Sequence, residues 1–432
     1  MFVILFCLAM PEVVEIPAPT YASVVAPLLN KHCVICHRSG EVAPFPLTSF
    51  EDARKRAGFL AKMAEEKRMP PWKAEPGFGE FHDTRILTGE EIVTLKAWAD
   101  AGAPLGDPAR VPPLPVFTEG WQLGKPDLVL EMPGDFDIPA DGPDIYRSFV
   151  MPTRLKTDQT VAAIEFKPGN HRTVHHAMLF LDSSGEARRK DAADPAHGFG
   201  TFGGPGFLPS GTLGGWAPGN KPRRLPEGMG RLLKKDSDIV IQVHYHPTGK
   251  MEKDRSKVAI YFTPEPAVQM VAMMPLATRK IDIPPGEKRY NRHVEFTTPE
   301  HLRVVTVTPH MHLLGQEMKV RAITPQGKEI PLIWIRHWEF NWQDSYSLVR
   351  PLDIPAGSKL VLDAWYDNSA GNPLNPSSPP QRVTWGEQTV DEMCLCFISI
   401  VADSPQQLQK VRSAVFLQLF SPKDFLRLMQ GK

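Results

Sequence analysis

The sequence predicts a multidomain chain in which a small all-α domain precedes two tandem all-β sandwiches of the jelly-roll type. The first observation behind this prediction is helical patterning over residues 21–105. The second is a linker dense in proline over residues 106–134. The third is a series of short strand-like runs between Pro and Gly turns, which divides into residues 135–265 and residues 266–432. The full length of 432 residues is enough to bury several separate cores.

The charge balance is even, because Lys and Arg together number 49 and Asp and Glu together also number 49. No global field therefore attracts nucleic acid, and we expect no nucleic-acid partner. Five cysteines are too few for a disulfide framework in a chain of this length. Cys394 and Cys396 lie two residues apart in an apolar run, where we expect buried thiols.

Residues 1–20 are expected to be the remnant of an export signal, or a tail. The apolar run over residues 2–10 resembles the hydrophobic region of a signal peptide, although no Lys or Arg precedes it. It is too short to span a bilayer.

Two segments of the all-α domain carry clear helix signals. A charged amphipathic helix is predicted over residues 49–67. Thr88-Gly89-Glu90-Glu91 has the pattern of a capping box and should open a last helix that ends at Asp100.

Strands are predicted wherever β-branched and aromatic residues gather between turn signals. In the first sandwich these runs are residues 127–131, 160–166, 176–181, 238–244 and 257–262. In the second they are residues 293–296, 302–308, 317–323, 330–334, 359–366 and 392–401, followed by a helix over residues 405–430.

The all-α domain carries the run Cys33-Val34-Ile35-Cys36-His37. Two thiols at this spacing can form thioether bonds to both haem vinyl groups, while His37 offers an imidazole to the iron. A zinc half-site is the alternative, but the sequence has no second cysteine pair to complete four ligands. Met69 is the leading candidate for the other axial ligand of a covalently attached haem c, and Met63 is the reserve. The region resembles a small cytochrome c, which implies a periplasmic or secreted protein.

Histidines cluster in the sandwiches in three groups. His310 and His312 lie two apart in a strand-like run and share one face, so they can bind one metal together. His175 and His176 are adjacent, so joint ligation requires a bulge or a strand end. His244 lies in an apolar strand. For each group the alternative is a structural histidine that is satisfied in the core or solvated.

Met393 adds a thioether to this set. Thioethers favour Cu(I) over zinc, so redox copper is the better prediction. Residues 135–400 resemble the copper type II, ascorbate-dependent monooxygenases, the family of peptidylglycine α-hydroxylating monooxygenase and dopamine β-monooxygenase. The resemblance rests on Val174-His175-His176-Ala177, Gln242-Val243-His244-Tyr245, Pro309-His310-Met311-His312-Leu313-Leu314-Gly315 and Asp391-Glu392-Met393-Cys394.

The resemblance implies two uncoupled copper ions, a C–H hydroxylation that uses O2, and a small-molecule substrate. His175, His176 and His244 would hold the electron-storing copper. His310, His312 and Met393 would hold the oxygen-binding copper. The resemblance assigns Gln242 to electron transfer, and a strand hydrogen bond is its alternative. The haem would deliver electrons from an external donor in place of ascorbate.

The sequence departs from the peptide-amidating members at two positions. Thr308 and Phe397 stand where those members use an Arg and a Tyr to hold the peptide carboxylate. Peptide amidation is therefore disfavoured, and a more apolar substrate is expected. Whether His246 is a ligand stays open. A non-catalytic haem and copper electron-transfer or copper-binding protein is the alternative function, and a hydrolytic zinc enzyme is the third.

Overall fold

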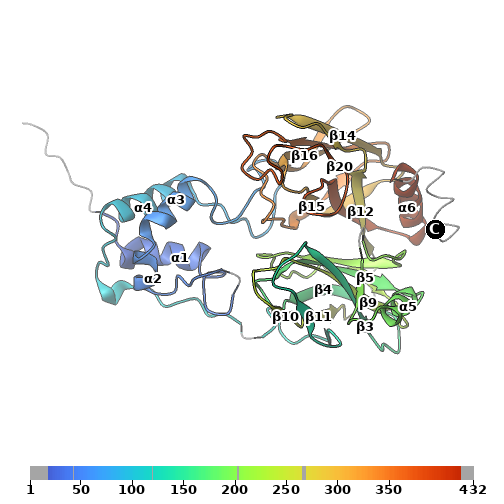
Figure 1. Cartoon of the computed structure of the whole chain (residues 1–432), viewed down its shortest axis with the longest axis horizontal. Helices are drawn as coiled ribbons and strands as arrows, with labels where there is room; N and C mark the ends of the chain where they lie inside the picture. The colour runs from blue at the N-terminus through green and yellow to red at the C-terminus, as the bar shows by residue number, and fades with distance from the viewer. Residues whose placement is uncertain (1–17, 42, 119, 202–203, 265–268, 420–432) are drawn as a thin grey trace, which may run out of the picture. The chain divides into compact units, whose positions relative to one another are not determined.

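The computed structural model describes residues 18–41, 43–118, 120–201, 204–264 and 269–419. The chain divides into two compact units (Figure 1), which we call the helical unit (residues 1–71 and 85–116) and the sandwich unit (residues 72–84 and 117–432). Most of the expected export signal, residues 1–17, lies outside the described residues. In the described part of the chain, no helix has the length and apolar character needed to cross a membrane.

The described part of the helical unit contains helices and turns. Its elements are η1 (Tyr21–Val25), α1 (Ala26–His32), α2 (Phe50–Arg54), α3 (Ala57–Glu65), α4 (Gly89–Asp100) and η2 (Pro108–Arg110). The single helix predicted over residues 49–67 is wrong, because Arg56 has a non-helical backbone that separates α2 from α3. The capping box is confirmed, since Thr88 and Glu91 each accept a hydrogen bond from the other's backbone N–H.

Trp98 of α4 is fully buried and joins the ends of the helical unit. Its indole Nε1 donates to the carbonyl of Pro104 at 3.0 Å, and the backbone N–H of Tyr21 donates to the same carbonyl at 2.9 Å. The rings of Tyr21 and Trp98 lie 6.2 Å apart. The helices η1 and α4 therefore pack against each other.

The first sandwich of the sandwich unit packs one sheet against another. One sheet contains β1 (Leu128–Glu131), β11 (Lys257–Phe262), β4 (Gln159–Lys167) and β8 (Met229–Leu233), in that order. The other contains β6 (Phe199–Gly200), β3 (Ile145–Pro152), β9 (Asp238–Tyr245), β5 (Val174–Asp182) and β7 (Gly211–Trp216). A two-stranded sheet of β2 (Phe136–Ile138) and β10 (Glu252–Asp254), and the helix α5 (Glu186–Ala193), complete it.

The second sandwich repeats this architecture. One sheet contains β12 (Gln269–Thr278), β21 (Cys394–Ala402), β15 (Leu302–His310) and β18 (Tyr346–Ile354), and the other contains β14 (Tyr290–Thr297), β19 (Lys359–Tyr366), β16 (Gly315–Ile323) and β17 (Glu329–Ile335). The pair β13 (Asp282–Ile283) and β20 (Val383–Thr384) and the helix α6 (Pro405–Leu419) are added to it. Parallel pairing of β8 with β12 makes one eight-stranded sheet that runs through both sandwiches.

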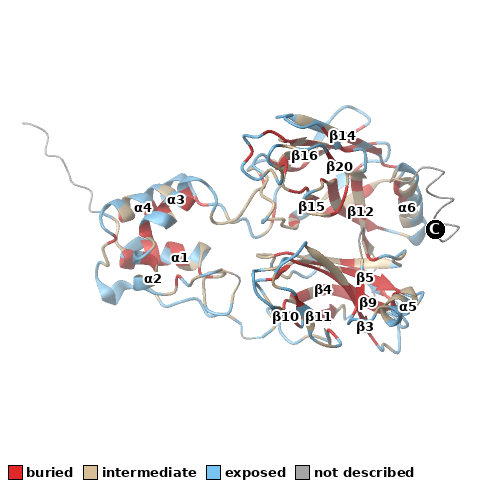
Figure 2. Ribbon diagram, in the orientation of Figure 1, coloured by how far each residue is buried: buried red, intermediate tan, exposed pale blue. Residues whose placement is uncertain are grey.

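Buried residues lie on the strands of both sandwiches (Figure 2), and each sandwich has its own apolar core. All eleven predicted strand runs overlap strands of the structure. Among the strands of eight residues or more in the described part of the chain, β3, β12 and β18 were not predicted. Each contains a proline, Pro152, Pro275 and Pro351 respectively, and proline argues against a strand in a sequence pattern. The helix predicted over residues 405–430 is confirmed as far as Leu419, beyond which it lies outside the described residues.

Residues Trp72–Thr84, which we call the strap, belong to the sandwich unit although they lie between α3 and α4 in the sequence. The backbone N–H of Glu75 donates to the carbonyl of Trp334 on β17 at 2.8 Å. The backbone N–H of His82 donates to the carbonyl of Ser347 on β18 at 2.9 Å. The strap thus adds to strands from both sheets of the second sandwich.

The strap also reaches the first sandwich through Asp83. Its carboxylate accepts a hydrogen bond from Arg223 at 2.7 Å and lies 3.8 Å from the ammonium of Lys221. Burial alone would raise the pKa of Asp83, but these cations lower it below its ordinary value. The predicted domain boundaries stay predictions, and they did not assign the strap to the sandwiches. The strand β1 lies inside the stretch predicted to be the linker.

Candidate metal centre

His175, His176 and His244 bring their ring nitrogens together at the end of the β5–β9 pair. The register between β5 and β9 shifts between Val174 and His176, so the two adjacent histidines do not alternate across the sheet. One donor atom from each of the three imidazoles lies within 4.8 Å of the others. This irregular entry into β5 is the feature that the adjacent pair requires for joint ligation.

The Nδ1 atoms of these imidazoles have the spacing of metal ligands. Nδ1 of His176 lies 3.1 Å from Nδ1 of His175 and 3.4 Å from Nδ1 of His244. Nitrogens bound at about 2 Å to one metal ion lie about 3.3 Å apart in tetrahedral geometry. The donor set therefore fits one copper ion.

Asp144, at the start of β3, lies behind His244. Its carboxylate is 3.0 Å from Nε2 of His244 and 2.7 Å from Nδ1 of His246. The His244 contact does not have hydrogen-bond geometry and acts as an electrostatic contact. Carboxylates in this position orient metal-binding imidazoles and raise their basicity. Sequence reasoning missed Asp144, because a lone Asp before a strand carries no signal.

His310 and His312 form the second set, and their ring centroids lie 5.1 Å apart. Nδ1 of His310 contacts the side-chain oxygen of Gln343, and Nδ1 of His312 lies 3.1 Å from the carbonyl of Asp391. Both acceptors require Nδ1 to carry the proton, which leaves Nε2 of each ring free as a metal donor. The tautomers therefore suit ligation by Nε2.

Glu392 is fully buried beside this second set. Its carboxylate accepts backbone hydrogen bonds from His312 at 2.9 Å, from Leu314 at 2.7 Å and from Met393 at 3.1 Å. Burial raises the pKa of Glu392 to about 8, although the three N–H donors oppose that rise. One side chain thus fixes the backbone of both His312 and Met393.

Four of the ligand imidazoles, those of His175, His176, His310 and His312, are held neutral. Burial lowers the pKa of His175 to about 3, of His310 to about 4 and of His312 to about 3. Burial lowers the pKa of His176 as well, and neighbouring imidazoles add to the effect. A neutral imidazole is the form that binds a metal ion, so these four imidazoles need lose no proton near neutral pH.

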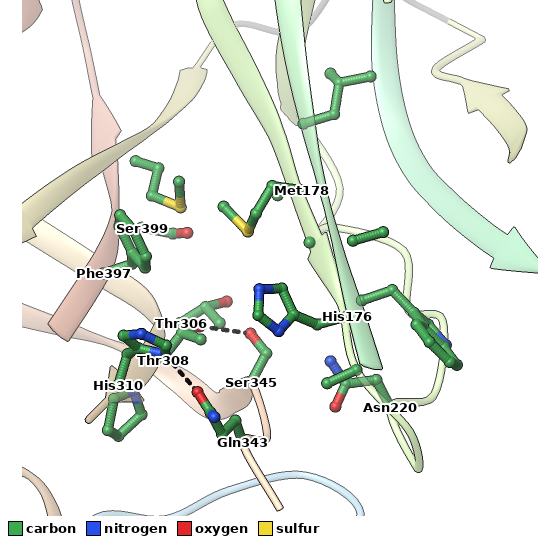
Figure 3. A pocket seen from close by; sticks show the side chains of 18 of the residues that line it. His176, Met178, Asn220, Thr306, Thr308, His310, Gln343, Ser345, Phe397 and Ser399 are labelled. Carbon is green, nitrogen blue, oxygen red and sulfur yellow. Dashed lines mark hydrogen bonds between the residues drawn. The ribbon is translucent and has the colours of Figure 1, made fainter. Parts of the chain in front are cut away.

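Residues of both sets line one cavity of about 740 Å³ in the sandwich unit. His176 and Met178 lie on one side of it, and His310, Phe397 and Ser399 lie on the other (Figure 3). The ring centroids of His176 and His310 are 6.4 Å apart. Met393 also lines the cavity. The cavity is therefore lined by His176 of the first set and by His310, His312 and Met393 of the second, while His175 and His244 cluster with His176.

Comparison with known proteins agrees with this geometry in the second sandwich. Residues 267–415 match a family described as copper type II ascorbate-dependent monooxygenase, C-terminal domain. The second sandwich matches the copper type II monooxygenases. This match spans β12 to α6 and contains His310, His312 and Met393.

Curated relatives extend the likeness over a longer part of the chain. Peptidylglycine alpha-amidating monooxygenase of Rattus norvegicus is 28% identical over 294 residues, which cover 63% of this chain and 26% of that protein. Peptidyl-glycine alpha-amidating monooxygenase A of Xenopus laevis is 29% identical over 271 residues, covering 58% of this chain and 26% of that protein. The chain thus spans about a quarter of the length of these relatives. Family match and relatives together support the copper type II monooxygenase family.

Among solved structures, the major capsid protein P2 from bacteriophage PM2 aligns with a TM-score of 0.25 and 8% identity, covering 64% of this chain and 97% of that chain. A likeness at this level has no bearing on fold or function.

The remaining predicted residues of the sandwiches lie at or near the cavity. Gln242 lines it and donates through Nε2 to Thr201 Oγ1 at 2.8 Å and to the Gly204 carbonyl at 2.7 Å. Its electron-transfer role stays a prediction. Thr308 and Phe397 also line the cavity. The family's guanidinium and phenol therefore have no counterpart at these two places.

In the helical unit, the three residues of the predicted haem attachment follow α1 directly. The carbonyl of Cys33 accepts hydrogen bonds from the backbone N–H of Cys36 at 3.1 Å and of His37 at 2.9 Å. Cys33, Cys36 and His37 therefore lie in a single turn of the backbone. Nδ1 of His37 lies 3.0 Å from the carbonyl of Phe45, which leaves Nε2 free as a donor to iron.

Among the described residues, neither Cys33 nor Cys36 forms a disulfide, and both are partly exposed. Met69 follows α3 and is partly buried, while Met63 is buried within α3. The donor set fits a covalently bound haem, and the axial role of Met69 stays a prediction. Cys394 and Cys396 are buried and free, as expected.

Proposed function

We propose that the protein is a copper-dependent monooxygenase, which uses O2 to hydroxylate a C–H bond of a small-molecule substrate. The observation that carries this proposal is the shared cavity, because imidazoles of both sets line it beside a largely apolar wall. A carrier that only passes electrons has no need of a cavity of about 740 Å³.

Copper would be held by His175, His176 and His244 in the first sandwich and by His310, His312 and Met393 in the second. Bound copper would supply one-electron redox chemistry toward O2, with a thioether favouring Cu(I) in the second set. Burial keeps His175, His176, His310 and His312 neutral. The Nδ1 contacts described above fix the tautomers of His310 and His312.

The substrate is proposed to differ from a peptide C-terminus. The relatives in the comparison are named for peptidylglycine amidation, but Thr308 and Phe397 offer no charge at the two anchor positions of that family. The hydroxyl of Thr308 is instead within 2.7 Å of Ser345 Oγ. Met178, Leu213 and Phe397 give the cavity apolar walls.

A haem c in the helical unit is proposed to deliver electrons from an external donor to the coppers. The observation in its favour is the turn at Cys33, Cys36 and His37 with a free imidazole Nε2. Covalent haem attachment would place the protein in the periplasm or outside the cell. The helical unit, a cytochrome c-like domain by this proposal, would act in the role of ascorbate, and its covalent connection to the sandwich unit would give it a high effective concentration.

Metal analysis tests the copper sites directly. The purified protein is expected to bind two copper ions per chain, falling to one in His244→Ala and to one in His310→Ala. His246→Ala is the matched control, because His246 is largely exposed and contacts the Asp144 carboxylate instead of the Nδ1 cluster. Loss of one copper in His246→Ala, or retention of both in His244→Ala, would contradict the assignment.

Oxygen uptake separates the enzyme from the carrier. Uptake coupled to hydroxylation of an added C–H substrate supports the oxygenase. Full copper and haem content without substrate-stimulated uptake would establish the non-catalytic alternative instead.

Haem delivery needs its own test. Cys33→Ala with Cys36→Ala should remove covalent haem while the copper content stays unchanged. In stopped-flow experiments, reduced haem in the intact protein should reoxidise when copper is added as Cu(II). Failure of that reoxidation would leave the haem without a role in this reaction.

A further inference from the structure

One arginine of the cavity wall has no partner. Arg231 lies on β8 opposite Val161 of β4 and lines the cavity that also holds His176 and His310. Throughout the described residues, its guanidinium makes no hydrogen bond, ion pair or ring contact with the protein. Desolvation is the sole influence on its pKa, which falls to about 10, so Arg231 stays protonated at neutral pH.

The other arginines of the same wall are engaged. Arg223 donates to Asp83 at 2.7 Å. The guanidinium of Arg224 lies 4.9 Å from the ring centre of Tyr261, and that of Arg279 lies 4.7 Å from the ring centre of Trp385. Arg231 is therefore distinct within the described wall of the cavity.

No carboxylate of the wall compensates for Arg231. Glu165 accepts hydrogen bonds from the backbone N–H of Gln122 at 2.9 Å and of Leu123 at 3.3 Å. Glu387 is buried, and its own electrostatic partners are Arg279 and Asp391. The positive charge of Arg231 thus stands uncompensated in the wall.

An uncompensated guanidinium away from bulk water is costly, and a bound anion removes that cost. Its planar fork of N–H donors matches a carboxylate through two parallel hydrogen bonds. The lining of the same cavity includes Phe166, Leu213 and Trp216, which are apolar or aromatic. The site therefore suits a molecule with one carboxylate and an apolar body.

We propose that Arg231 binds the carboxylate of an apolar carboxylic acid and so selects the substrate class of this cavity. The identification of the bound acid as a substrate rests on the proposed function, but the binding of its carboxylate by Arg231 does not. The anchor lies on the first sandwich, in contrast to the two second-sandwich positions occupied by Thr308 and Phe397.

Binding of a matched acid and amide tests the proposal in the full chain. Calorimetry with 4-phenylbutyrate and with neutral 4-phenylbutanamide should give at least tenfold tighter binding of the acid. In Arg231→Met, the affinity for the acid should fall by tenfold or more while the affinity for the amide is unchanged. Arg231→Lys should keep part of the preference for the acid. Arg350→Met is the control, since Arg350 is exposed on β18 and outside the cavity wall, and it should bind both probes as the unaltered protein does.

Equal affinity of the unaltered protein for acid and amide would overturn the proposal, and so would an unchanged acid preference in Arg231→Met. Thermal unfolding of each variant checks its fold, and the acid-to-amide ratio of the unaltered protein decides the case if Arg231→Met does not fold. Because no turnover is measured, selective acid binding without oxygen uptake would refute the proposed function and leave this inference standing.

Discussion

The imidazole rings of His176 and His310 lie 6.4 Å apart with their planes inclined at 78°. One ring belongs to β5 of the first sandwich and the other to the end of β15 of the second. The ring of Phe340, from the second sandwich, stacks on His175 at 5.0 Å. The two ligand sets share no residue, yet they are close neighbours in one cavity.

This proximity predicts a magnetic interaction. With both sets loaded with Cu(II), the electron paramagnetic resonance spectrum should be broadened by dipolar coupling. His244→Ala and His310→Ala, each holding one copper, should give sharp single-site spectra. A spectrum of the full protein equal to the sum of those two would show that the sets stand farther apart in solution.

Asp144 is predicted to tune copper affinity at the first set. Its carboxylate contacts His244 and His246 and also accepts a hydrogen bond from Thr389, in the segment that leads to Met393. Asp144→Asn should weaken copper binding there by about 10–100-fold, as loss of such a carboxylate does elsewhere. Chelator competition measures the affinity. His246→Ala should change it far less, and equal losses in the two variants would argue against orientation of His244 by Asp144.

Glu392→Gln should destabilise the second sandwich. An amide offers one acceptor oxygen in place of two, so at least one of the backbone N–H groups of His312, Leu314 and Met393 loses its partner in a fully buried position. The free energy of unfolding should fall by about 2–4 kcal/mol. Denaturant titration measures it, with exposed Glu329→Gln expected within about 0.5 kcal/mol of the unaltered protein. Equal stability of the two variants would mean that the backbone finds other acceptors.

Glu387 should contribute a pH dependence to stability. Burial raises its pKa from 4.5 to about 6, so the native state binds this proton more tightly than the unfolded state does. The stability that depends on this proton is present below pH 4.5 and is lost as the pH rises through about 6, a change of about 2 kcal/mol at most. The difference in unfolding free energy between Glu387→Gln and the unaltered protein should therefore grow between pH 4.5 and 6.5. A difference that is flat over this range would contradict the assignment.

The strap should stabilise the second sandwich. Phe81 is 9% exposed and packs within the core of that sandwich, with its ring 5.3 Å from the ring of Tyr346. Phe81→Ala should cost about 3–5 kcal/mol of unfolding free energy. Phe59→Ala is the control, because Phe59 is half exposed on α3. Similar small losses of unfolding free energy in Phe81→Ala and Phe59→Ala would show that the strap is not part of the core.

Several features of the site followed from local pattern. The adjacent pair His175 and His176 demanded a break in strand register, and the shift after Val174 supplies it. The buried strand around His244 was visible as an apolar run, and Thr88 with Glu91 marked the start of α4. Each of these signals lies within a few residues of sequence, where hydrogen-bond geometry and side-chain alternation decide the outcome.

Other features had no local signal. Glu392 belongs to the motif that carries Met393, but its contacts with the backbone of His312 and Leu314 join segments about 80 residues apart in sequence. Asp144 and the strap also had no local signal. Ala74 and Phe81 of the strap look like ordinary loop residues in the sequence, and only the structure shows that they pair with strands of the second sandwich. The strand β12 was not predicted because Pro275 and the methionines of this segment do not give a strand-like sequence pattern. In the structure β12 pairs along ten residues with β21 and β8.

The sequence by itself determined which side chains could bind haem and copper, because donor chemistry and close spacing are properties of the chain. Only the tertiary structure decided that histidines of both sets line one cavity, that Asp144 and Glu392 contact these sets, and that Arg231 is left without a counter-charge. The physical reason is that distance, desolvation and hydrogen-bond completion are set by segments that meet only after the sheets have packed.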